Sequence, residues 1–211
     1  MSKRLQISAA VFLFLVGVGA ALGVYFRTVE KESVPVVKET KTVLLKKGGR
    51  TVTVDLLAYP VTSGSVAYQG PVLEEGEENF KEPHTYTGVT IKALLDAVGG
   101  IQEGDRVAVI ATDGWTKELP YAVIAGETEC GSVILALLRD GASVEEWRDA
   151  PELVFLPEDE RFTNDDMLAA FGEELSHYYD GRPSTTGLLV KNVAYLVVNY
   201  DGGALPAADG D

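Results

Sequence analysis

An uncharged segment, residues 6–26, is the feature that most constrains how this chain folds. Its residues are mainly Val, Leu, Phe, Ala and Gly. A helix of this length, at about 1.5 Å per residue, spans roughly 30 Å, which is the hydrocarbon thickness of a bilayer. Lys3 and Arg4 precede the segment, and Tyr25 and Arg27 lie at its end like an interfacial belt. The sequence therefore predicts a single membrane-spanning anchor over residues 1–26.

The same segment leaves a second interpretation open. Ala21 and Gly23 offer small residues for a cleavage site, as in a removed signal peptide, although the length of the apolar run favours an anchor. The basic residues that follow the segment count toward a cytoplasmic domain under the positive-inside rule. Long domains often translocate regardless of such charges, so we expect the domain to lie outside the cytoplasm.

The charge of the chain limits its partners. Its 211 residues include 18 basic and 32 acidic side chains, a net charge of −14. Such a surface repels phosphate backbones, so nucleic acid is excluded as a partner. The length allows one domain besides the anchor. We expect a stalk over 27–41, a domain over 42–200 and a flexible acidic tail over 201–211.

Patterns along residues 42–200 predict more strands than helices. The expected strands are 42–45, 51–57, 106–111, 115–119, 133–138, 153–156 and 188–199. The expected helices are 90–98, 120–125, 143–148 and 165–178, with a loop-rich excursion over 60–85. No strand–helix–strand unit repeats at a regular period. The pattern therefore favours an α+β fold, a mixed sheet or open barrel with peripheral helices.

Few residues here are typical of metal or nucleophilic chemistry. The single cysteine, Cys130, cannot form an internal disulfide and is too little for a zinc or iron–sulfur site. It precedes an apolar run, so we expect a buried structural thiol, with a metal-ligand or redox role as the alternative. His84 and His177 have no zinc-type partner at helical spacing. The acidic stretch 158–166 lacks the spacing of an EF-hand, which leaves a weak calcium site as a minor alternative.

Several segments, in order, carry a family resemblance. Residues 86–99 read YTGVTIKALLDAVG, residues 107–115 read VAVIATDGW, and Leu119-Pro120 follows. Residues 153–157 read LVFLP, and residues 190–198 read VKNVAYLVV. This series resembles the oxidoreductase molybdopterin-binding domain, the sulfite-oxidase-like fold, over most of residues 42–200.

The resemblance implies a molybdopterin cofactor, but the ligands that it implies are missing. In that family a cysteine thiolate holds the metal before the segment that matches 86–99, and a basic loop after the strand that matches 153–157 holds the pterin phosphate. Here residues 63–70 contain no cysteine, Cys130 does not match, and the loop begins Glu158-Asp159-Glu160. Carboxylates oppose a phosphate by Coulomb repulsion. We therefore expect no bound cofactor, with molybdopterin kept as what the resemblance implies.

Three functions remain open. The first is a cofactor-free module at the membrane that binds a small ligand or a partner protein. The second is a molybdopterin-dependent oxidoreductase with an unusual metal ligand or with Cys130, and the third is a structural or calcium-binding surface protein. The sequence leaves open whether the protein is an enzyme. The candidate cleft residues are Thr112, Asp113, Trp115 and Tyr121. The alternative for them is a tight turn with a half-buried tryptophan.

Overall fold

The computed structural model describes residues 41–74, 77–143 and 146–205. The predicted anchor, nearly all of the predicted stalk and residues 206–211 lie outside this part of the chain. Within it, no helix has the length and apolar character that a membrane crossing requires.

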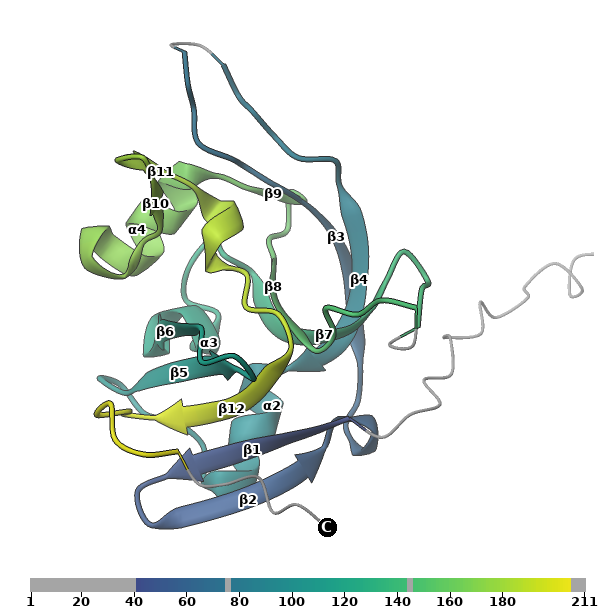
Figure 1. Ribbon diagram of the computed structural model, residues 1–211, viewed down its shortest axis with the longest axis vertical. Helices are drawn as coiled ribbons and strands as arrows, with labels where there is room; N and C mark the ends of the chain where they lie inside the picture. Colours follow the sequence, from purple (N-terminus) through teal and green to yellow (C-terminus); the bar gives the residue numbers. More distant parts are fainter. Residues whose placement is uncertain (1–40, 75–76, 144–145, 206–211) are drawn as a thin grey trace, which may run out of the picture. The chain divides into compact units, whose positions relative to one another are not determined.

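One five-stranded sheet has the order β2-β1-β12-β5-β6 (Figure 1). Its strands are β1 (Thr42–Lys47), β2 (Arg50–Asp55), β5 (Arg106–Ala111), β6 (Thr116–Pro120) and β12 (Val193–Val198). Strand β1 pairs with β12 in parallel, and all other neighbours are antiparallel. The predicted β1–β2 hairpin is present, and Gly48 provides the positive φ of 55° in its turn.

A second five-stranded sheet has the order β8-β7-β4-β3-β9. Its strands are β3 (Thr62–Tyr68), β4 (His84–Thr90), β7 (Ser132–Arg139), β8 (Glu152–Leu156) and β9 (Arg161–Phe162). Only β3 and β9 pair in parallel. Figure 1 shows β3 and β4 running together along one side of the domain, with their connection projecting beyond it. A small hairpin, β10 (Tyr178–Tyr179) and β11 (Arg182–Pro183), completes the strands.

Helices are few and short. The α-helices are α2 (Ile91–Leu95), α3 (Tyr121–Ala125) and α4 (Asn164–Leu175), and the 3₁₀ turns are η1 (Leu56–Ala58), η2 (Asp96–Val98) and η3 (Thr185–Leu188). Helix α2 begins after Thr90, whose hydroxyl accepts a hydrogen bond from Ala93 N. Two mixed sheets with few helices make an α+β fold, as the sequence predicts.

The longest predicted helix is shorter in the structure. Its N-cap is Thr163, which forms a capping box with Asp166. Gly172 has non-helical angles, φ 67° and ψ 174°, and the helix ends at Leu175. The prediction that it continues to residue 178 is wrong, because Gly172 breaks the pattern and Tyr178 belongs to β10.

Two other predictions differ from the structure. Strand β3 lies inside the segment predicted to be loop-rich, since Ser63, Gly64 and Ser65 carry no apolar alternation and β4 supplies the pairing. The helix predicted over 143–148 does not appear in its described residues, which form turns in which Trp147 N donates to Ser143 O. Residues 144 and 145 lie outside the described part.

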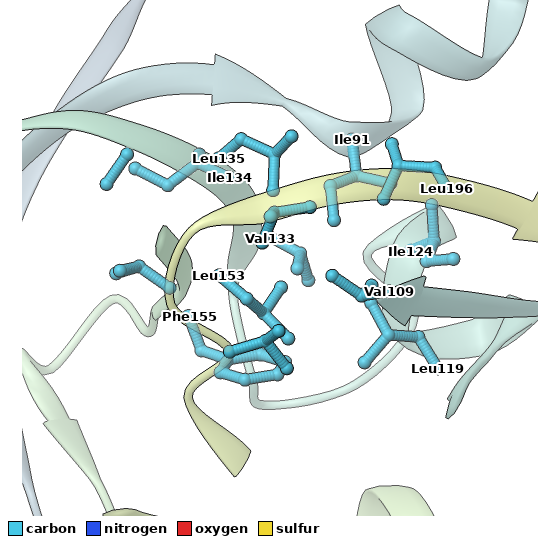
Figure 2. Close-up of a cluster of buried hydrophobic side chains, with 14 of the residues drawn as sticks. Ile91, Val109, Leu119, Ile124, Val133, Ile134, Leu135, Leu153, Phe155 and Leu196 are labelled. Atoms are coloured by element: carbon cyan, nitrogen blue, oxygen red, sulfur yellow. The ribbon is translucent and has the colours of Figure 1, made fainter. Parts of the chain in front are cut away.

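The core lies between the two sheets and the short helices. Figure 2 shows side chains from α2, α3, β5, β6, β7, β8 and β12 pointing toward one another, among them Ile91, Ile124, Val109, Leu119, Leu135, Phe155 and Leu196. Strand β5 is apolar on both faces because a second, smaller cluster around Ala108, Ile110 and Val197 covers its other side. Burial on this scale stabilises by about 1.5–3 kcal/mol for each large apolar side chain. The core thereby anchors the β5–β6 hairpin, whose Val107, Val109 and Leu119 side chains belong to it.

Candidate functional site

The turn between β5 and β6 holds Trp115 at the surface. Ala111 N donates to Trp115 O at 2.9 Å, and Asp113 Oδ1 accepts from Trp115 N at 2.9 Å. Gly114 supplies the positive φ of 89° that the turn needs. Thr112 N donates to Asn192 O at 3.0 Å, which joins the turn to the segment before β12. Held in this way, Trp115 keeps 48% of its surface exposed.

A pocket of about 240 Å³ lies between this turn and the segment before β12. Its lining residues are Ala111, Thr112, Asp113, Trp115, Leu189, Lys191 and Asn192. Three of the four predicted cleft residues therefore come together here. Tyr121 does not, because it starts α3 beside the opposite end of the hairpin, where Arg106 pairs with Pro120. There Tyr121 N donates to Asp105 O at 3.0 Å.

Two residues that the sequence did not single out for a site lie against Trp115. Lys117 Nζ is 5.3 Å from the centroid of the Trp115 ring, and His177 Nδ1 is 3.4 Å from Lys117 Nζ. The rings of His177 and Trp115 are arranged edge to face, with 6.5 Å between their centroids. Strand periodicity signals that residues 115 and 117 share a face. No sequence signal connects either residue to His177, which was expected near a helix end.

Lys117 and His177 lie in a partly apolar environment. Burial lowers the pKa of the Lys117 ammonium. Burial and the neighbouring Lys117 also lower the pKa of His177. Over residues 41–74, 77–143 and 146–205, neither side chain has a carboxylate oxygen within 4.0 Å. Lys191 differs, because its Nζ lies 2.7 Å from Asp149 Oδ2.

The region where the resemblance implies a metal ligand is closed by hydrogen bonds instead. Asn164 N donates to Gln69 Oε1 at 2.8 Å, and Asn164 Nδ2 donates to Gly70 O at 3.0 Å. Thr185 N donates to Asn164 Oδ1 at 3.0 Å, and Thr185 Oγ1 donates to Gln69 O at 2.8 Å. We call these groups the Gln69–Asn164–Thr185 clasp. It leaves their polar atoms satisfied and contains no thiol.

Cys130 does not suit a metal ligand. The side chain is fully buried, and this burial raises the pKa of its thiol to about 11. A metal ligand must be reachable by the metal and share it with other ligands, and this side chain is enclosed by the core. The expected buried thiol is confirmed. In the part of the chain that the structure describes, no group of three or more His, Cys, Asp or Glu side chains could hold a metal ion.

The loop after β8 is acidic where the resemblance implies a phosphate clamp. Glu158 lines a surface pocket of about 420 Å³ together with Glu127 and Glu129. Three carboxylates facing one pocket repel a phosphate. The described residues therefore do not fit a molybdopterin at the place that the resemblance implies.

Comparison with known proteins finds little. No protein-family model matches the chain, and no curated protein matches it. A solved structure that is similar to it is the sulfane dehydrogenase SoxCD from Paracoccus pantotrophus, with 16% sequence identity and a TM-score of 0.47. The similarity covers 77% of this chain and 40% of that one, so this chain spans less than half the length of its structural neighbour.

Proposed function

We propose that this protein is a membrane-anchored binding module that works without a cofactor and receives its ligand at the pocket beside Trp115. The observation that carries the proposal is the exposed indole of Trp115, held at the pocket by a hydrogen-bonded turn. Ligand pockets are typically lined by aromatic side chains with a few polar groups that fix the orientation of the ligand. The half-buried Lys117 and His177 beside it add polar groups that can orient a ligand.

The cofactor-free part of the proposal is supported by the chemistry of three places. The clasp uses the polar groups of Gln69 and Gly70, Cys130 is a buried neutral thiol, and Glu158 stands where a phosphate clamp would be. The alternative, a molybdopterin-dependent oxidoreductase, needs a metal ligand that these residues do not provide.

The test is metal and pterin content. The full chain would be expressed in a host that makes molybdopterin, purified in a mild detergent, and assayed for molybdenum, tungsten and pterin fluorescence. We expect none above the level of an unrelated membrane protein purified in parallel. Near-stoichiometric metal and pterin would overturn the proposal. If the Cys130→Ser variant then lost that metal, Cys130 would be its ligand.

The membrane location is supported by residues 6–26 and by the translocation of long domains. We expect the full chain to stay with membranes after an alkaline carbonate wash. In intact cells stripped of any outer layer, an added protease should remove the domain. A domain that is protected until the cells are lysed would place it in the cytoplasm. Recovery of a shortened soluble chain would show that the segment is a cleaved signal peptide.

A further inference from the structure

We infer that the site at Trp115 takes a small organic anion, with a planar body against the indole and a carboxylate or sulfonate group held by Lys117, which His177 orients. The inference rests on the proposed function and names the chemical class of the ligand. Trp115 connects the two parts of the site, because it lines the pocket and also contacts both Lys117 and His177.

The first argument is the unneutralised charge of Lys117. A partly buried ammonium loses hydration and normally regains the lost free energy from a carboxylate partner. This chain has 32 acidic residues and a net charge of −14, yet none of the described carboxylates lies within 4.0 Å of Lys117 Nζ. The nearest polar partner is a second basic group, His177. An incoming anion would supply the missing partner.

The second argument is that His177 is held in place. Its carbonyl accepts from Ser184 N at 2.9 Å, and its ring lies directly against Gly187. An ammonium can only donate, so Lys117 Nζ donates to His177 Nδ1, which makes the neutral ring carry its proton on Nε2. The remaining N–H groups of Lys117 then stay available to a carboxylate, as a charge-assisted donor. The Nε2–H of His177 lies on the other side of the ring, at Gly187, so the imidazole orients the ammonium and does not share the carboxylate.

The remaining charges at the pocket are already engaged. Lys191 pairs with Asp149 at 2.7 Å, and Asp113 Oδ1 accepts the hydrogen bond from Trp115 N. The exposed Asp113 carboxylate disfavours a multiply charged anion, so a monoanion fits best. The pocket volume of about 240 Å³ is below the range of ~300–1,000 Å³ that is usual for drug-sized ligands, which limits the body to about one ring system.

Benzoate is the probe, and benzamide, which has the same shape without the charge, is its control. The full chain in non-ionic detergent carries Trp147→Phe, so that Trp115 is the only tryptophan and its fluorescence reports binding. We expect benzoate to bind about tenfold more tightly than benzamide, because charge-assisted hydrogen bonds replace neutral ones. Lys117→Met should reduce benzoate binding to the level of benzamide. Lys81→Met, at an exposed lysine elsewhere, should leave it unchanged.

The pH dependence adds a readout that a purely structural Lys117 would not give. Protonation of His177 adds a second positive charge, so benzoate should bind more tightly as the pH falls through the pKa of His177, while benzamide should not respond. His177→Gln should abolish this response. Absent benzoate binding, equal affinity for the two probes, or undiminished binding in Lys117→Met would overturn the inference. The proposed function fails separately, on the metal and pterin content of the same preparation.

Discussion

The imidazole ring of His177 lies so close to the backbone of Gly187 that a Cβ atom at position 187 would overlap it. Residue 187 belongs to η3, whereas His177 follows the end of α4. The contact requires a residue without a side chain at position 187, and the same ring lies beside Lys117 and Trp115. Gly187, which does not line the pocket, thus leaves the space in which the imidazole reaches Lys117.

Gly187→Ala should therefore displace the His177 ring. Burial and Lys117 both lower the pKa of His177 in the wild type. A displaced ring is more solvated and farther from Lys117, so its pKa should rise toward the ordinary value for histidine. An NMR titration measures this, with His84 as the second histidine of the chain and an internal reference. Gly49→Ala is the control, since a Cβ there would meet no atom within 4 Å. An unchanged His177 pKa would show that the contact does not position the ring.

The buried Glu152 should make the protein less stable as the pH rises. Only 2% of its surface is exposed, and burial, partly offset by Lys191, raises the pKa of its carboxyl from 4.5 to about 7. The folded state therefore binds more protons than the unfolded state between these two values. The stabilisation that Glu152 contributes through its bound proton is fully present below pH about 4.5 and is lost by pH about 7. The loss in the free energy of unfolding over this range is about 3 kcal/mol.

Glu152→Gln tests this directly. Glutamine keeps the shape of the side chain and cannot ionise, so it removes the cost of a buried charge at an atom, Oε2, that has no hydrogen-bond partner among the described residues. The free energy of unfolding of both proteins would be measured in denaturant across this pH range. The wild type should lose stability relative to Glu152→Gln as the pH rises, and the variant should be the more stable above neutrality. The difference between the two curves removes the contributions of other groups, such as Asp105 and Asp140, whose pKa values are lowered. Parallel curves would mean that the pKa of Glu152 is the same in the folded and the unfolded state.

The Gln69–Asn164–Thr185 clasp should be important for stability. Asn164→Ala would leave Gly70 O without a partner in a buried place, whereas Thr185 N would keep its hydrogen bond to Gln69 O. A buried acceptor left without a partner costs about 1–3 kcal/mol, so we expect a loss of about that size in the free energy of unfolding. Gln102→Ala, at an exposed side chain, should change it little. A loss as small as that of the control would show that water replaces the clasp.

Cys130 should be unreactive in the folded protein. Its burial and a pKa of about 11 leave little thiolate at neutral pH. A thiol reagent such as a disulfide dye should label it only after unfolding in denaturant. A cysteine introduced at the exposed Ser132, with Cys130 replaced by alanine, should react at once and serves as the control. Rapid labelling of native Cys130 would reopen its role as a ligand.

Local signals were sufficient for the hairpin that carries the pocket. The β-branched and apolar run Arg106–Ala111, followed by Asp113-Gly114, predicted a strand and a turn, and both are present. Strand β3 was missed because Ser63, Gly64 and Ser65 become a strand only by pairing with β4. The placement of Tyr121 also depended on tertiary structure. Tyr121 is close to Trp115 in sequence, but the strand between them leads away from the pocket.

The sequence alone determined four properties: the acidic charge, the uncharged segment 6–26, the α+β class and the absence of a cysteine from residues 63–70. These depend on composition and short-range periodicity, which need no knowledge of packing. Only the tertiary structure decided that Lys117 meets His177, 60 positions away, beside an exposed tryptophan. That contact depends on the kink of α4 at Gly172 and on the space left by Gly187, because side-chain positions at this range are set by the packing of distant segments.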